Sequence, residues 1–477
     1  MTKKSTFAAA VAALLLAAGG ATAAALLLNR RDVTTSSPEA YRLYRLGREN
    51  ELKLYNREAL ASYAEALSHD GRFVMATLRL AMLIFPRDPA RAKDLIRSAE
   101  RYRDGLTRRE QRILDLHVAD FGGDSEKYGA LVDQYLKEFP DDTEGYMRKA
   151  RQLVSAGKMP EAIAVYERIL SIDPNDAFAY NTLGYYFLQQ GDFAKAEDYL
   201  RRYRFLAPDQ ANPYDSLGEL FTTTGRYDEA EESFKKALEI KPDFHHSIGM
   251  LGTVALGRGE YEKAATRYEQ AALVAEKPGE KGELFIAAAY SLAFVGRREE
   301  ALSKLLTIES SIPSLAESER PYVTARLHQV RGIVLSILGD GAAALAEVDE
   351  AAKVAELLPA PKKEGWSRNL VRIRSLVLAR QGRAAEAVEG LSRDMPNDLK
   401  ADGLGYFPAV WMTRIALAES YVALGKTDEA QQALSPIFEK NPHFEPAVAT
   451  ARKLGLEIEV PRVLPAIQLE KEAAKKL

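Results

Sequence analysis

Three residue types recur at a constant step along the middle of this 477-residue chain. Proline, glycine and alanine each return every 34 residues over four consecutive units. The three series are Pro140, Pro174, Pro208 and Pro242; Gly157, Gly191, Gly225 and Gly259; and Ala162, Ala196, Ala230 and Ala264. A fixed period of this length, kept in phase by three residue types, indicates a repeat protein in which each unit is one supersecondary element.

Each 34-residue unit predicts two helices joined by a tight turn. A stretch with helical apolar periodicity runs up to the glycine, a short polar turn follows, and a second periodic stretch ends at the proline. Glycine provides the positive φ that ends the first helix, and proline ends the second because it has no amide hydrogen to donate. The alanine marks the point where the two helices come closest, so that only a small side chain fits. The sequence therefore predicts an all-α chain.

Two units carry a longer pattern. The unit from Ala177 contains Tyr180, Leu183, Gly184, Phe187, Ala196, Leu200 and Pro208. The unit from Ala211 contains Tyr214, Leu217, Gly218, Phe221, Ala230, Phe234 and Pro242. These residues resemble the tetratricopeptide repeat (TPR), with the pattern W-x2-L-G-x2-Y…A-x3-F…P, although no unit has the tryptophan. The resemblance implies a right-handed α-solenoid of helix–turn–helix repeats.

Downstream the period lengthens to 43 residues, in the series Gly296, Gly339, Gly382 and Gly425 and the series Ala301, Ala344, Ala387 and Ala430. We expect about 11 helix pairs in all. The predicted domains are a TPR array over residues 38–280, with its best units over 143–278, and a TPR-like array of 43-residue units over 281–455. The boundary between the two arrays is expected near residues 277–279. A C-terminal tail over residues 456–477 follows the second array. The lengthened connections are predicted to hold Pro313, Pro321, Pro359, Pro361, Pro396 and Pro408.

The N-terminus carries an uncharged stretch over residues 7–28. The charges that flank it are Lys3, Lys4, Arg30 and Arg31. A helix of this length spans roughly 33 Å, enough to cross a hydrocarbon core of about 30 Å. Residues 1–31 are therefore interpreted as a transmembrane signal anchor or as a cleavable signal peptide with its cleavage motif at residues 21–23. The apolar run continues beyond that motif, which favours the anchor; a buried soluble helix is the third alternative.

The orientation of such an anchor is not fixed by its flanking charges. More arginines follow the span than lysines precede it, which favours a cytoplasmic body. Long domains translocate largely regardless of such charges, and an N-terminal signal before a soluble body usually leads to export. We expect a single-pass membrane protein whose body is periplasmic or otherwise extracytoplasmic, with a cytoplasmic-facing body as the alternative.

The composition and the motifs do not point to an enzyme. The formal net charge of −3 offers no electrostatic case for nucleic acid, and the chain has no cysteine for thiolate chemistry or thiolate-bound metals. The phosphate-binding loop, the G-x-S-x-G motif and the kinase motifs are missing. His245 and His246 are adjacent on a helix and diverge by about 100°, so they cannot both face one metal. We expect no catalytic, cofactor-binding or metal-binding residues, no cofactor and no small-molecule substrate.

The resemblance implies a curved inner surface where a protein or peptide partner docks. In TPR proteins the second, fifth and ninth positions of each unit face this groove. Those positions are Glu144, Met147 and Arg151; Phe178, Asn181 and Tyr185; and Asn212, Asp215 and Glu219. Phe178 and Tyr185 lie two turns apart on one face with Asn181 between them, an arrangement suited to gripping a peptide backbone. The alternative is that these side chains pack within the array.

The sequence therefore leads to a functional hypothesis. The chain is interpreted as a bacterial, membrane-anchored TPR scaffold that assembles a membrane-associated complex through protein–protein interaction, with residues 7–28 in the membrane. Two alternatives remain open: a soluble exported (periplasmic) TPR adaptor released by signal cleavage, and an accessory subunit of a large membrane complex.

Overall fold

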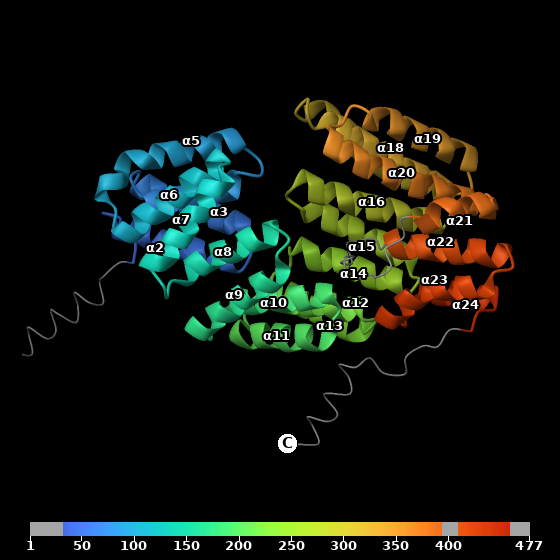
Figure 1. Ribbon diagram of the computed structural model, residues 1–477, viewed down its shortest axis with the longest axis horizontal. Coiled ribbons are helices and arrows are strands. Elements are labelled where there is room, and N and C mark those ends of the chain that lie inside the picture. Colours follow the sequence, from blue (N-terminus) through green and yellow to red (C-terminus); the bar gives the residue numbers. More distant parts are fainter. Residues whose placement is uncertain (1–31, 394–408, 458–477) are drawn as a thin grey trace, which may run out of the picture. The chain divides into compact units, whose positions relative to one another are not determined.

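The computed structural model describes residues 32–393 and 409–457 of the chain. These residues form 23 α-helices and two short 3₁₀-helices, so the predicted all-α solenoid is confirmed for this part (Figure 1). Their contacts separate into two compact units, one ending at Pro174 and the other beginning at Asn175. We call them the N-terminal unit and the C-terminal unit and describe each by itself. The predicted domain limits near residues 38, 280 and 455 remain predictions.

The N-terminal unit consists of helix pairs. Its described helices are α2 (Pro38–Leu52), α3 (Asn56–His69), α4 (Val74–Ile84), α5 (Pro89–Ala99), η1 (Glu100–Gly105), α6 (Arg108–Gly122), α7 (Ser125–Glu138), α8 (Thr143–Ser155) and α9 (Met159–Ile172). Thr107 and Glu110 form a capping box at the start of α6, satisfying backbone amides that have no partner within the helix. A continuous hydrophobic core runs between the helices from Val33 to Tyr135.

The C-terminal unit is built from helix pairs as well. Its helices up to η2 are α10 (Ala177–Gln190), α11 (Phe193–Leu206), α12 (Ala211–Thr223), α13 (Tyr227–Ile240), α14 (His245–Gly257), α15 (Tyr261–Val274), α16 (Pro278–Phe294), α17 (Arg298–Ser311) and η2 (Ile312–Ser314). The remaining ones are α18 (Arg320–Ile337), α19 (Gly341–Ala355), α20 (Ala360–Arg380), α21 (Ala384–Arg393), α22 (Ala409–Ala423), α23 (Thr427–Lys440) and α24 (Glu445–Leu454). The first helices α16, α18 and α20 are the longest of this unit, with 17, 18 and 21 residues.

The repeated glycines end the first helix of each pair, as their spacing predicts. All eight members of the two series, from Gly157 to Gly425, have φ between 71° and 81°. This left-handed conformation is open to glycine without steric cost, and the turn that follows sends the chain back antiparallel to the first helix. The prolines of the 34-residue series stand just after the second helices: α11 ends at Leu206, for example, and Pro208 follows.

The repeated alanines lie where paired helices approach each other most closely. All eight are fully buried, so this prediction is also confirmed. A glycine in the first helix makes the same contact from the other side. A Cβ at Gly218 would stand 2.5 Å from the ring of Phe234, and one at Gly252 would stand 2.7 Å from the ring of Tyr268. Small residues on one helix therefore make room for an aromatic ring on its partner.

The nine extra residues of the longer period are divided between connections and helices. The first helices α12 and α14 have 13 residues each, whereas α18 has 18 and α20 has 21. Pro321 and Pro361 stand in the first turns of α18 and α20 and not in the connections where the sequence analysis placed them. Proline fits there because the first-turn amides need no intrahelical acceptor and its φ is already helical.

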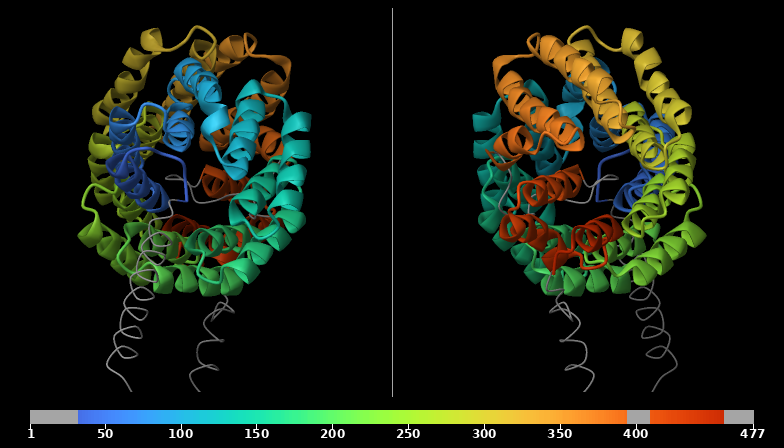
Figure 2. Two further views of the ribbon diagram at one scale, coloured as in Figure 1. Left: turned by 90° about the vertical axis from the view of Figure 1, so that its left-hand side faces the viewer. Right: turned by 90° about the vertical axis from the view of Figure 1, so that its right-hand side faces the viewer.

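The C-terminal unit closes on itself between two turns that lie far apart in sequence. The Asn441 amide nitrogen, in the turn between α23 and α24, donates to the Thr222 carbonyl at 3.1 Å and to the Tyr227 hydroxyl at 3.1 Å. Both acceptors flank the turn between α12 and α13. The right-hand view of Figure 2 shows the red helices α23 and α24 lying beside the green ones of this unit.

Several predictions fall on residues that the structure does not describe. The anchor or signal peptide over residues 1–31, nearly all of the tail over 456–477, and both Pro396 and Pro408 lie outside the described residues. Within the described part of the chain, no helix is both long enough and apolar enough to cross a membrane.

Candidate functional site

The first helices of successive pairs form one face of the C-terminal unit. Helix α12 contacts α10 and α14, and the series α16, α18, α20, α22 and α24 continues the same pattern of contact between alternate helices. Such contacts arise where a solenoid curves toward its first helices. This inner face is where the groove residues of the second and third units were predicted to lie.

Four of those predicted residues come together on α10 and α12. The Tyr185 hydroxyl donates to the Glu219 carboxylate at 2.6 Å. The Ser216 hydroxyl donates to the Asn181 side-chain oxygen at 2.9 Å. Asp215 lies one turn before Glu219 on the same helix, and its side chain is 3% exposed. The structure thus links the two helices through polar side chains on their inner face.

His246 on α14 completes the group. Its Nδ1 lies 2.8 Å from one Asp215 oxygen and 3.7 Å from the Glu219 carboxylate. The Ser247 hydroxyl donates to the other Asp215 oxygen at 2.5 Å. We call Asn181, Tyr185, Asp215, Glu219 and His246 the inner polar cluster. It joins three successive first helices, and the His246 side chain keeps 35% of its surface exposed.

The charges of the inner polar cluster are strongly coupled. Burial on its own lowers the pKa of His246, but the carboxylates of Asp215 and Glu219 outweigh it and raise that pKa to about 10. Burial raises the pKa of Glu219, and the His246 imidazolium opposes that shift. Burial and then the Glu219 carboxylate hold the pKa of Tyr185 well above its ordinary value, so its hydroxyl stays a donor. At neutral pH the cluster therefore holds an imidazolium between two carboxyl groups.

Asp215, Glu219 and His246 are also the residues, within the described ranges, that could together hold a metal ion. One ligand atom each from Asp215, Glu219 and His246 lies within 4.8 Å of the others. The raised pKa of His246 keeps a proton on the imidazole, and a metal would have to displace it before the nitrogen could coordinate. The sequence predicts no metal ligand here, and the geometry by itself describes an ion-paired histidine.

The other predicted groove residues have different surroundings. Phe178 is 39% exposed on α10, whereas Asn212 is buried and its amide donates to the Tyr203 hydroxyl at 3.0 Å. In the N-terminal unit Met147 is half-buried and Arg151 is exposed. The groove assignment of these residues remains a prediction.

Glu144 belongs to an ion-pair network inside the N-terminal unit. Its carboxylate lies 3.0 Å from Arg79 on α4 and 2.9 Å from Arg148 on α8. Arg79 also approaches Glu51 of α2 at 3.3 Å, so one guanidinium ties three first helices together. Burial alone raises the pKa of Glu144, but Arg79 and Arg148 hold it well below the ordinary value.

Sequence reasoning missed His246, although the signal was present. It applied the second, fifth and ninth positions to three units only. In the next unit, which starts at His245, the second position is His246. Ser216 and Ser247 stand outside that positional rule, and they enter the site because their hydroxyls satisfy Asn181 and Asp215.

Comparison with known families identifies the repeats. Residues 153–219 and 411–436 match tetratricopeptide repeat families. Residues 187–309 match the family described as the middle TPR-like domain of cilia and flagella-associated protein 70. The chain therefore carries tetratricopeptide repeats and is a TPR scaffold for protein–protein interaction, a class of repeat module without catalytic chemistry. No curated protein matches the chain.

Solved structures with similar helices cover different shares of the chain. One is the crystal structure of MamA protein, whose sequence is 23% identical. The match covers 35% of this chain and 91% of that chain, with a TM-score of 0.30. A chain in the crystal structure of the APC/C hetero-tetramer Cut9–Hcn1 is 16% identical; the match covers 92% of this chain and 81% of that chain, with a TM-score of 0.44. PilF of Pseudomonas aeruginosa is 19% identical; the match covers 45% of this chain and 95% of that chain, with a TM-score of 0.36.

Proposed function

We propose that this chain is a membrane-associated scaffold that binds a segment of a protein partner on the inner face of its C-terminal unit. The observation that carries the proposal is the convergence of polar side chains from α10, α12 and α14 on one partly exposed site. Carboxyl oxygens of Asp215 and Glu219 dominate that site, and a single imidazolium offsets them. The partner segment that fits it best presents lysine, arginine or backbone N–H donors.

The rigidity of the cluster supports binding over packing alone. Its members are held by hydrogen bonds from Tyr185, Ser216 and Ser247, so a partner meets groups whose positions are already fixed. Preorganised groups lose little side-chain entropy on binding. Phe178, exposed one turn before Asn181 on the same helix, adds an apolar contact at the edge of the site.

Capture of the partner from solubilised native membranes tests this proposal. Wild-type protein and the variants Tyr185→Phe, Glu219→Gln and Glu232→Gln are compared by quantitative mass spectrometry. Glu232 is exposed on the outer helix α13 and provides the matched control. We expect a partner recovered by the wild type and the control to be lost from the two cluster variants. Equal recovery by all four proteins would contradict the proposal.

The membrane association rests on residues 7–28. We propose that this uncharged stretch is an uncleaved anchor, that the body is exported, and that the protein is bacterial and organises a membrane-associated complex. A soluble exported adaptor and an accessory subunit of a larger membrane complex are the alternatives. Fractionation followed by N-terminal sequencing separates them: recovery of the intact N-terminus in the membrane fraction is expected, whereas a mature soluble chain starting near Ala24 would refute the anchor.

A further inference from the structure

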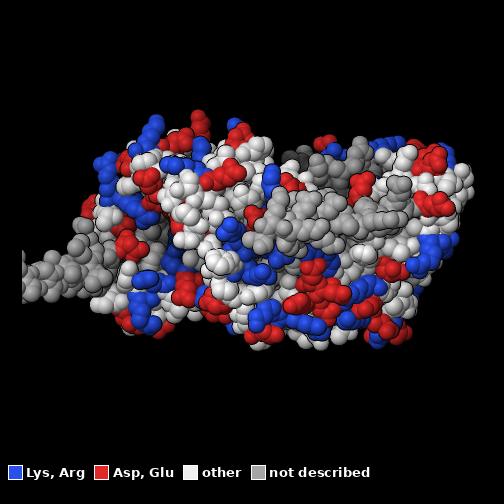
Figure 3. Space-filling view, turned by 90° about the horizontal axis from the view of Figure 1, so that it is seen from below, with Lys and Arg blue, Asp and Glu red and all other residues white. Residues whose placement is uncertain are grey.

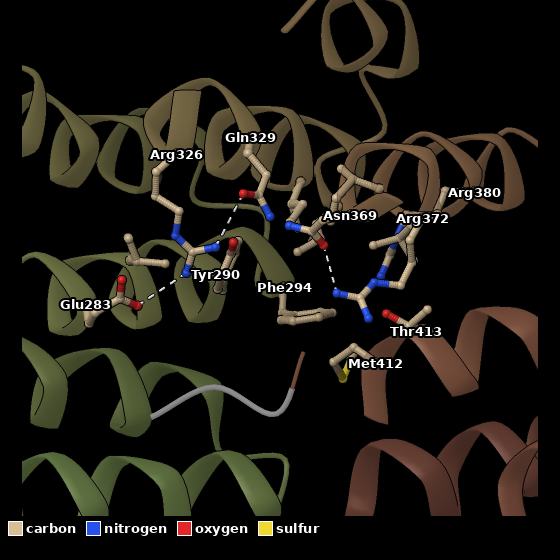
Figure 4. A pocket seen from close by; sticks show the side chains of 15 residues that line it. Glu283, Tyr290, Phe294, Arg326, Gln329, Asn369, Arg372, Arg380, Met412 and Thr413 are labelled. Carbon is tan, nitrogen blue, oxygen red and sulfur yellow. Dashed lines mark hydrogen bonds and ion pairs between the residues drawn. The ribbon is translucent and has the colours of Figure 1, made fainter. Parts of the chain in front are cut away.

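The first helices of the longer repeats line a pocket separate from the inner polar cluster. It lies between α16, α18, α20 and α22 and has a volume of about 190 Å³ (Figure 4). An apolar cavity of about 150 Å³ is large enough to hold a benzene molecule, so this pocket accepts one large side chain. Its apolar lining includes Ile333, Ile373 and Leu376, each at most 8% exposed.

Three arginines stand around this apolar lining. Arg326 on α18 is neutralised by Glu283 on α16 at 3.3 Å. Arg372 on α20 donates to the Asn369 side-chain oxygen at 2.7 Å, a neutral acceptor. Arg380, two turns farther along α20, has its guanidinium 5.9 Å from the centre of the Phe294 ring. Figure 4 shows Arg326 and Arg372 on opposite sides of Phe294.

The pocket holds more positive charge than its carboxylates offset. Among the described residues, no carboxylate forms an ion pair with Arg372 or Arg380. Arg380 is exposed and so open to a ligand; the protein atoms around it lower its pKa, and the charge of Glu419 opposes that shift only in part. A guanidinium in this setting is stabilised by an incoming carboxylate, which it can bind through two parallel hydrogen bonds.

The spacing of the two arginines fixes the spacing of the ligand's charges. Eight residues of helix separate Arg372 from Arg380, which is about 12 Å along the axis. An extended peptide advances about 3.3 Å per residue, so carboxylates four positions apart match this distance. Alternate side chains of an extended peptide point to the same side. An apolar side chain midway between the two acids then faces the pocket together with them.

We propose that this pocket binds an extended acidic segment of a protein partner, with one aromatic or large aliphatic side chain in the pocket and flanking carboxylates on Arg372 and Arg380. The inference is independent of the function proposed for the inner polar cluster, because it uses other helices and the opposite charge. We call the site the arginine pocket.

Calorimetric titration of the full-length protein with short peptides tests the arginine pocket. The probe is acetyl-Glu-Ser-Phe-Ser-Glu-amide, which places both acids and the ring on one side of an extended chain. Comparison peptides replace both glutamates by glutamine, replace phenylalanine by alanine, or scramble the order. Protein variants are Arg372→Gln, Arg380→Gln and the matched control Arg374→Gln, whose side chain pairs with Asp349 of α19. Circular dichroism checks that each variant retains its helices.

We expect the probe to bind the wild type and the Arg374→Gln control with affinities within about twofold of each other. Each of Arg372→Gln and Arg380→Gln should weaken binding about tenfold or more, as loss of a charge-assisted hydrogen bond requires. The glutamine peptide, which lacks both carboxylates, should bind the wild type at least as weakly as the probe binds either single arginine variant, and Glu219→Gln should leave probe binding unchanged.

Three results would overturn the inference. One is no binding of the probe at millimolar concentration, and another is equal binding of the scrambled peptide. The third is tighter binding of a fatty acid or a short RNA than of the probe in the same calorimetric titration, with competition between the two, because another class of ligand would then fit the pocket better. Failure of the partner capture on the inner polar cluster, with these peptide results intact, would leave the arginine pocket standing.

Discussion

Replacing Asn441 by alanine should open the contact that closes the C-terminal unit. Asn441 is 1% exposed, and its amide donates to the Thr222 carbonyl and to the Tyr227 hydroxyl. In the variant, the Thr222 carbonyl still accepts a hydrogen bond from the Gly225 backbone amide at 3.3 Å. The buried Tyr227 hydroxyl, by contrast, loses its hydrogen bond with the Asn441 side chain. Two lost hydrogen bonds at about 1 kcal/mol each, with a further penalty for a buried polar group, give about 2–4 kcal/mol.

Hydrogen exchange with mass spectrometry measures this closure at both of its ends. A loss of about 2–4 kcal/mol against local opening corresponds to roughly thirty-fold or faster exchange. We expect faster exchange in the turn at residues 222–227 as well as around residue 441, although 214 positions separate Tyr227 from Asn441. The variant Glu439→Ala, exposed on α23, should match the wild type. Faster exchange confined to the neighbourhood of residue 441 would show that Asn441 does not hold the two turns together.

Three further predictions follow from buried contacts. Gly218→Ala places a Cβ 2.5 Å from the Phe234 ring, and the resulting strain should lower the free energy of unfolding, measured with urea, by about 1–3 kcal/mol. An unchanged free energy of unfolding would show that the two helices can move apart without cost. Arg79→Ala removes one of the two arginines that pair with the Glu144 carboxylate and should destabilise the N-terminal unit by about 3 kcal/mol, measured as faster hydrogen exchange there and not in the C-terminal unit. Burial first, and then neighbouring arginines, hold the pKa of His117 well below 6.5, so the unfolded chain takes up a proton that the folded chain excludes. Stability should therefore fall as the pH drops below about 6.5, by up to about 1.4 kcal/mol per pH unit, and His117→Phe should flatten that slope in urea titrations at pH 7.5 and 5.5.

The helix pairs could be predicted from the sequence, because the residues that begin, end and pack each pair lie within one repeat unit. The glycine φ values, the buried alanines and the prolines after the second helices all follow from residues at fixed spacing. Pro321 and Pro361 were misplaced for a related reason. A proline ends one helix or begins another with equal ease, so its position alone does not reveal how far the next helix extends.

Contacts between units were harder to predict. The groove positions of the repeat family placed Tyr185 and Glu219 on the inner face. They did not predict that the Asn212 side chain is buried and donates to the Tyr203 hydroxyl. Nothing in the pattern links Asn441 to Thr222, because that contact depends on the accumulated curvature of the intervening pairs. A small change per unit, summed over many units, decides which distant turns meet.

Site-specific photo-crosslinking tests most directly whether the inner face of the C-terminal unit binds the partner. A photoreactive phenylalanine replaces Phe178, 39% exposed beside the inner polar cluster, or Phe205, 77% exposed on the second helix α11. On the face seen from below in Figure 3, acidic and basic side chains are interspersed, which is typical of a solvated surface. We expect a partner adduct from position 178 and none from position 205. An adduct from position 205 alone, or equal adducts from both, would show that the inner face is not the binding surface.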